Sequence, residues 1–208
     1  MAPTPIAAPV PLESGPHALP SCAEQYPFRL VELPAAPGLY ERSRTDRAFG
    51  TPALVQAIED ASFRLALEFP DADPVYVGDL SSELGGPLPP HIFHSDGRSA
   101  DIGLYGTDGD QPLGAFVELA PDQLDLLKTW TLIDAFLGTG AVEHILLDQS
   151  LIDALHDWLI AEGRLSDAEA AQIFPPSSTP RLWEMSGILR AASGHRDHFH
   201  VRFRCEGP

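Results

Sequence analysis

The stretch His198-Phe199-His200-Val201-Arg202-Phe203 alternates polar and apolar side chains near the end of the chain. Alternation of this kind predicts a β-strand, here ending near Arg204, because successive side chains on a strand point to opposite faces. His198 and His200 then share one face, and Phe199 turns to the other. The stretch therefore predicts a strand that places two imidazoles in one pocket, with an apolar residue packed beneath them.

The segments upstream alternate between amphipathic helices and short β-rich runs. Thr51 and Pro52 are typical of an N-cap and a first helical residue, and they predict a helix to about Phe69. Further helices are expected at 122–137 and 151–162, and strands at 74–80, 100–105, 142–147 and 188–192, the last paired with 198–204. This mixture predicts an α+β fold, with a small antiparallel sheet flanked by helices.

Composition limits the classes of protein to which the chain can belong. It has 208 residues and 44% hydrophobic residues, which suits one domain with a real core. We expect a proline-rich, largely irregular N-terminal arm over residues 1–39 and a folded domain over 40–208. No apolar run is long enough for a membrane span, and a net charge of −17 argues against binding to nucleic acid.

The ends of the chain bear on the compartment in which it works. Cys22 and Cys205 lie near opposite ends, and a disulfide between them is slightly favoured over two buried free thiols. Such a bond requires an oxidising compartment. The first basic residue is Arg29, so the opening segment lacks the basic start of a secretory signal peptide. The export route therefore stays open.

Histidines concentrate in two short segments, which contain five of the eight in the chain. The first holds His94 and leads to Asp101, and the second holds His195, His198 and His200. Two imidazoles and one carboxylate are a typical ligand set for catalytic zinc, with the fourth position left for water. The His-x-His pair alone would fit solvent-exposed residues equally well, but its combination with His94 and Asp101 favours a metal site.

These segments resemble one family along residues 40–205, the penicillin-insensitive murein endopeptidases within the LAS metallopeptidases. The motifs that carry the resemblance are Val77-Gly78-Asp79-Leu80-Ser81, Gly85-Gly86, His91-x-x-His94 with Asp101-Ile102, and His195-x-x-His198-Phe199-His200-Val201-Arg202-Phe203 with Cys205. The resemblance implies a LAS-type fold and a Zn²⁺ ion bound by His94, Asp101 and His200. It further implies a periplasmic or secreted enzyme that hydrolyses peptidoglycan cross-links, including those between D-alanine and diaminopimelate.

By the same resemblance, His198 and His195 line the reaction centre. No His-Glu-x-x-His helix supplies a glutamate base, so His198 is our candidate for the general base. His195 would then stabilise the oxyanion or assist proton transfer, and the two roles can be exchanged. The chain departs from the family pattern at Ser95 and Ser99, where polar residues that support the ligands are altered.

Other residues and other functions remain open at this point. Asp79 fits either a buttress of the site or a strand-end cap, and His91 either a substrate contact or a solvated loop residue. His144 and His156 are expected to be structural. Alternative functions are another LAS-type peptidase or D,D-carboxypeptidase, a secreted antibacterial toxin that degrades the wall, and a non-catalytic zinc-containing module that binds wall peptides.

Overall fold

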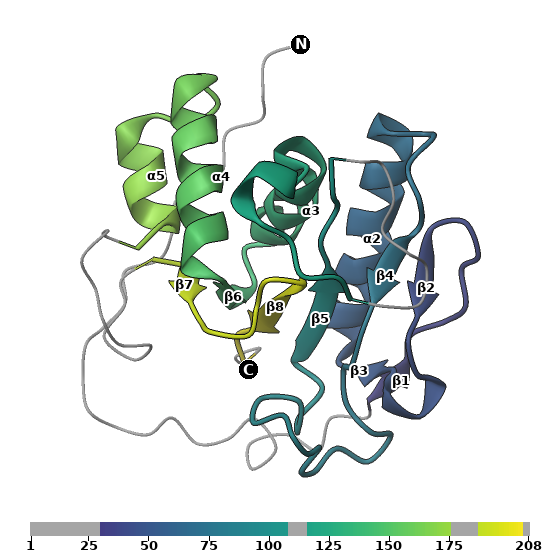
Figure 1. Ribbon diagram of the computed structural model, residues 1–208. Coiled ribbons are helices and arrows are strands. Elements are labelled where there is room, and N and C mark those ends of the chain that lie inside the picture. Colours follow the sequence, from purple (N-terminus) through teal and green to yellow (C-terminus); the bar gives the residue numbers. More distant parts are fainter. Residues whose placement is uncertain (1–29, 108–115, 176–186, 206–208) are drawn as a thin grey trace, which may run out of the picture.

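Six strands form a mixed sheet in the spatial order β2-β4-β5-β8-β6-β7 (Figure 1). The computed structural model describes residues 30–107, 116–175 and 187–205. In spatial order the strands are β2 (Tyr40–Arg42), β4 (Val75–Val77), β5 (Ser99–Gly103), β8 (His198–Phe203), β6 (Val142–Leu147) and β7 (Leu189–Ala191). A second, two-stranded antiparallel sheet pairs β1 (Val31–Glu32) with β3 (Phe49–Gly50).

The directions of the strands confirm the α+β class and correct the predicted sheet. The inner pairs β4–β5, β5–β8 and β8–β6 are antiparallel, whereas the outer pairs β2–β4 and β6–β7 are parallel. A parallel pair needs a crossover connection, and helices supply one at each side of the sheet. The prediction that 188–192 pairs with 198–204 is wrong, because β6 lies between β7 and β8.

In the described part of the chain, four α-helices accompany the sheet. They are α2 (Pro52–Glu68), α3 (Leu126–Gly138), α4 (Gln149–Ala161) and α5 (Asp167–Ile173), and two short 3-10 helices are η1 (Thr45–Arg47) and η2 (Pro121–Gln123). The predicted cap of α2 is confirmed, since the Thr51 hydroxyl accepts a hydrogen bond from the Leu54 amide. The segment predicted as one helix at 122–137 is η2 followed by α3, which Asp125 caps.

The alternation predicted for 198–203 determines which face of the sheet packs against the helices. Phe199 and Phe203 are buried and contact the ring of Phe136 on α3, with ring centroids 6.0 and 6.4 Å apart. The neighbouring residue His200 therefore points to the opposite face, and it pairs in register with Asp101 of β5. The sheet thus has a core face toward α3 and a polar face that carries the predicted ligands.

Part of the predicted arm belongs to the folded unit. Strand β1 pairs with β3, and the following residue, Leu33, is completely buried. Residues 1–29 lie outside the described residues, as does Cys22, so its pairing with Cys205 stays a prediction.

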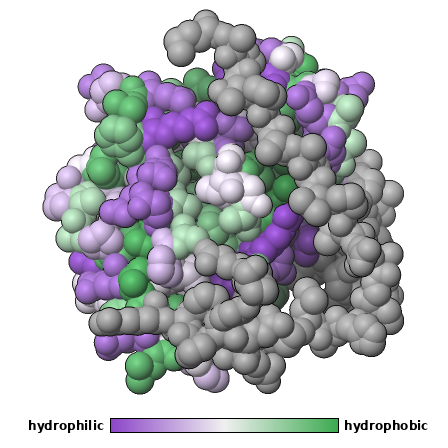
Figure 2. Space-filling model, turned by 180° about the vertical axis from the view of Figure 1, so that it is seen from behind, coloured by the Kyte–Doolittle hydropathy of each residue, from purple (hydrophilic) through white to green (hydrophobic). Residues whose placement is uncertain are grey.

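The described surface mixes polar and apolar regions. On the face seen in Figure 2 the middle is largely apolar to neutral, and hydrophilic side chains gather along the upper edge. Exposed apolar residues include Leu84 and Ile92. Among the described residues, no helix is long and apolar enough to cross a membrane.

Candidate metal centre

Three ligand atoms converge on the polar face of the sheet. The Nε2 atom of His94 lies 3.1 Å from Oδ1 of Asp101 and 3.1 Å from Nδ1 of His200, and the latter two atoms are 2.8 Å apart. The three residues are only 1–3% exposed. Tetrahedral zinc bound at 2.0–2.1 Å separates its ligand atoms by about 3.3 Å, so a small outward shift suffices to admit the ion. The residues named by the sequence therefore fit a metal.

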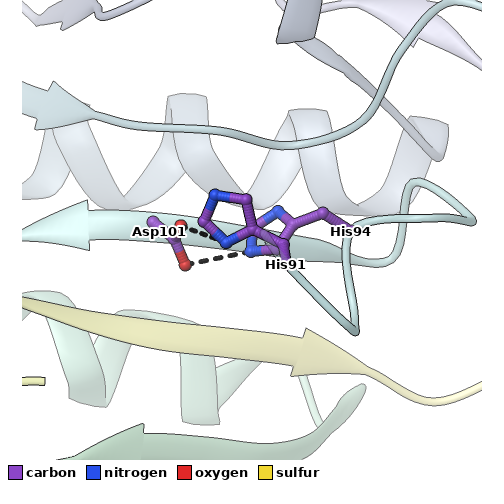
Figure 3. A group of neighbouring side chains, drawn as sticks. All are labelled: His91, His94 and Asp101. Atoms are coloured by element: carbon purple, nitrogen blue, oxygen red, sulfur yellow. Dashed lines mark hydrogen bonds and ion pairs between the residues drawn. The ribbon is translucent and has the colours of Figure 1, made fainter. Parts of the chain in front are cut away.

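His91 extends this group. His91, His94 and Asp101 could hold a metal ion, because one ligand atom from each lies within 4.8 Å of the others (Figure 3). The Nδ1 atom of His91 is 3.8 Å from Oδ2 of Asp101. The sequence left His91 as a substrate contact or a solvated loop residue, and the structure places it among the residues that could hold a metal ion, called the metal-binding group below.

The ligands come from two kinds of structure. Asp101 and His200 are held by the hydrogen-bonded ladder between β5 and β8. His91 and His94 lie in the loop between β4 and β5, which turns at Gly97 with a φ of +69° before entering β5. The turn at Gly97 brings His94 back over Asp101.

Hydrogen bonds fix the orientation of both loop histidines. The carbonyl of Leu80 can only accept, so Nδ1 of His94 carries a proton and donates to it across 2.8 Å. The protonated imidazole donates from Nε2 to Asp101, and in the neutral imidazole the Nε2 lone pair is aimed at the other ligand atoms. In His91, Nε2 lies 3.1 Å from Asp79, whose carboxylate also accepts from Arg47. Asp79 is therefore a buttress of the site, as a metal ligand usually requires.

The charges of the group are strongly coupled. Burial by itself would raise the pKa of Asp101, but hydrogen bonds from His200 and His94 outweigh it and hold the pKa far below its usual value. Burial would likewise lower the pKa of His94, yet Asp101 reverses the effect and the pKa is raised. Burial dominates at His200 and lowers its pKa to about 4. Asp101 is thus an anion, and His200 is neutral at neutral pH.

The two predicted catalytic histidines lie beside the metal-binding group. His198 is 3.8 Å from Oδ1 of Asp101 through Nε2, and its Nδ1 is hydrogen-bonded to the carboxylate of Asp197. His195 contacts His198 with ring centroids 4.8 Å apart and donates from Nδ1 to the carbonyl of Ser193. Each imidazole therefore has one nitrogen occupied and the other, Nε2, available as a base.

Phe116 forms one wall next to His198. Its ring stacks on the imidazole with centroids 4.8 Å apart and packs edge-on against Tyr76. Gly78 makes room for this ring, because a Cβ atom there would lie 2.5 Å from Phe116. No pattern in the sequence indicates a role for Phe116, because Phe116 and His198 are far apart in the chain and only the fold brings them into contact.

Two arginines, Arg98 and Arg202, bind residues of the loop between β4 and β5. Arg202 on β8 donates to the carbonyl of Phe93 at 2.9 Å, to the Ser99 hydroxyl at 2.9 Å and to Asp96 at 2.8 Å. Arg98 also pairs with Asp96, at 2.8 Å. Asp96 and Ser99 therefore hold the loop to β8 through these two arginines.

Among the described residues two further histidines, His144 and His156, differ in burial. His144 is 4% exposed and lies beside His200, with ring centroids 6.3 Å apart. Its two ring nitrogens and Nε2 of His200 have no hydrogen-bond partner among the residues that the structure describes. His156 lies on the surface of α4, away from the site.

The chain was compared with protein-family models and with curated proteins. No protein-family model matches the chain, and no curated protein shows a significant match.

Proposed function

We propose that the protein is a zinc-dependent endopeptidase that hydrolyses amide bonds in the peptide cross-links of peptidoglycan. The observation that carries the proposal is the convergence of His94 Nε2, Asp101 Oδ1 and His200 Nδ1 within 3.1 Å of one another on one sheet face. Supporting it, His198 and His195 stand beside these atoms in the order that the murein endopeptidase motifs require.

The donor set favours zinc over harder cations. Two or three imidazole nitrogens and one carboxylate oxygen suit Zn²⁺, whereas Mg²⁺ and Ca²⁺ prefer all-oxygen sites. His94, Asp101 and His200 would hold the ion, with His91 near enough to join them. When bound, zinc supplies a Lewis acid for the scissile carbonyl and a water whose pKa lies near neutrality.

The protein's own groups supply proton transfer. Asp197 holds Nδ1 of His198, so Nε2 of this imidazole faces the metal-binding group and can take a proton from the attacking water. Burial and then the neighbouring His198 lower the pKa of His195, which keeps that imidazole neutral. The base in this proposal is His198, which afterwards passes the proton to the leaving amine. His195 assists by relaying this proton through Nε2, and it can donate to the oxyanion only while Nε2 carries the proton.

The proposal extends to fold and place of action. Together with the motifs, the mixed sheet with ligands on one face supports a LAS-type architecture. Peptidoglycan as substrate implies action in the periplasm or outside the cell, and cross-links of the D-alanyl–diaminopimelate type are the expected target.

The test is incubation of metal-loaded protein with purified cross-linked peptidoglycan, followed by mass spectrometry of the released muropeptides. We expect cross-linked dimers to be converted to monomers, and a chelator to stop the reaction. His198→Ala should keep the metal and lose turnover, while the matched surface variant His156→Ala should behave as wild type. Intact dimers after incubation with zinc-loaded wild type would refute the proposed function.

A further inference from the structure

Arg190 stands in the same row of the sheet as two of the proposed ligands. The strand register joins Asp101 to His200, His200 to Leu146, and Leu146 to Arg190. Side chains of residues directly opposite on paired strands lie on the same face. Arg190 is therefore on the metal-binding face, at edge strand β7, and two strand spacings of about 5 Å each separate its backbone from that of His200.

The guanidinium of Arg190 has no carboxylate within ion-pair distance among the described residues. Six other arginines each pair with a carboxylate: Arg42, Arg44, Arg47, Arg64, Arg98 and Arg202. Within the part of the chain that the structure describes, Arg190 donates from Nε alone, to the carbonyl of Gly187 at 3.5 Å. Glu143 acts on it from a greater distance. Most of its five N–H donors therefore have no partner among the described residues.

Burial makes this unpaired charge costly. The side chain is half-buried, and loss of solvent lowers the pKa of Arg190, although an arginine stays charged at neutral pH. A partly desolvated cation without a partner is unfavourable until an anion binds it. The chain has 30 acidic residues against 13 basic ones, so carboxylates outnumber the cations that could pair with them.

We propose that Arg190 binds a carboxylate of the substrate, on the side of the metal centre toward β7. The inference rests on the proposed function and deepens it, because the peptides of cross-linked wall carry free carboxylates on residues next to the bond that is cut. A planar guanidinium binds a carboxylate through two parallel hydrogen bonds, which gives both affinity and orientation. Arg190 is in this view a specificity residue, and it takes no part in proton transfer.

The experiment compares two forms of one cross-linked muropeptide, with its carboxylates free or amidated. Binding to the metal-free protein is measured by calorimetry, and kcat and KM are measured with the metal-loaded protein. The variants are Arg190→Gln, Arg190→Lys and the matched control Arg164→Gln, whose guanidinium stacks on Trp158 in the α4–α5 region. Circular dichroism of each variant shows whether it is folded.

Arg190→Gln should bind the free-carboxylate peptide about 10–100-fold more weakly, as expected for a charge-assisted hydrogen bond, with kcat nearly unchanged. The amidated peptide should bind equally to wild type and variant. Arg190→Lys should recover part of the loss, and Arg164→Gln should show none.

Four other results would overturn one or both of the proposals. Equal binding of the free-carboxylate peptide by wild type and Arg190→Gln, or the same loss with both peptides, overturns the role of Arg190 alone. Carboxylate-dependent binding that Arg190→Gln abolishes, without cleavage by metal-loaded wild type, overturns the proposed hydrolysis and supports Arg190. Absence of both binding and cleavage overturns both proposals.

Discussion

The two faces of strands β5 and β8 are almost equally buried and chemically opposite. Ile102 and Phe199 on the core face are at most 1% exposed, and Asp101 and His200 on the other face are at most 3% exposed. Apolar burial stabilises the fold, whereas burial of a carboxylate and an imidazole costs free energy unless partners compensate. A step of one residue along each strand thus separates residues that stabilise the fold from residues proposed to bind the metal. Substitutions on the two faces should therefore have separable effects.

The largest effect on stability is expected on the core face. Phe199→Ala removes a fully buried ring that packs on Phe136, and it should lower the free energy of unfolding by about 3–5 kcal/mol. Chemical denaturation measures this loss. If the variant does not fold, Phe199→Leu serves instead, with a cost of about 1 kcal/mol or more. A metal affinity that fell in the folded Phe199→Leu variant as much as in a ligand variant would contradict the separation of the faces.

The largest effect on metal binding is expected on the polar face. His200→Ala removes a ligand atom that lies within 3.1 Å of both other ligand atoms. It should weaken zinc binding by more than about 100-fold, since loss of outer partners alone costs 10–100-fold. The fold of the metal-free variant should persist. Competition with a chromophoric chelator measures the affinity, and His156→Ala controls for nonspecific binding by histidine.

A smaller effect is expected from the loop that carries His91. Asp79→Asn replaces the carboxylate that contacts both His91 and Arg47 with a neutral amide, so His91 is less firmly oriented. Zinc affinity should fall about tenfold, with turnover reduced only at limiting zinc. Titration of zinc against activity reads out both quantities. Unchanged affinity would mean that His91 lies outside the functional ligand set.

The smallest effect is expected from acidification of the metal-free protein. His200 has a folded pKa of about 4, below the ordinary value of 6.5, so the unfolded chain binds a proton there first. The free energy of unfolding therefore decreases as the pH falls from 6.5 to 4, because protonation of His200 favours the unfolded chain. His94 acts in another window, because its raised pKa adds stability below 6.5 that is lost as pH rises through the folded pKa. Denaturation of wild type and His200→Asn at several pH values compares the slopes, and equal slopes between pH 4 and 6.5 would count against this assignment.

Local patterns in the sequence were enough to predict most elements of the fold. The helix after Thr51-Pro52 and the strand at 142–147 follow from capping and β-rich composition, and both are present. The parallel pairing of β7 with β6 could not be predicted, because no local pattern specifies which strand becomes a neighbour. Helix α5 was missed, although Ser166 and Glu169 form a capping box that marks its start.

The candidate site was predicted in part. The alternation at 198–203 indicated the direction of His200, and the turn at Gly97 allowed His94 to approach Asp101. The place of His91 in the metal-binding group was missed, because its orientation depends on Asp79, which is distant in the chain. Arg190 was missed for a similar reason, since only the assembled sheet aligns it with His200.

The most direct test of the central claim is the zinc content of the purified protein. Wild type and His200→Ala would be loaded with zinc, dialysed against metal-free buffer and analysed by inductively coupled plasma mass spectrometry. Convergence of His94, Asp101 and His200 predicts about one zinc ion per chain in wild type and almost none in the variant. Wild type without zinc, or equal zinc in both proteins, would contradict it.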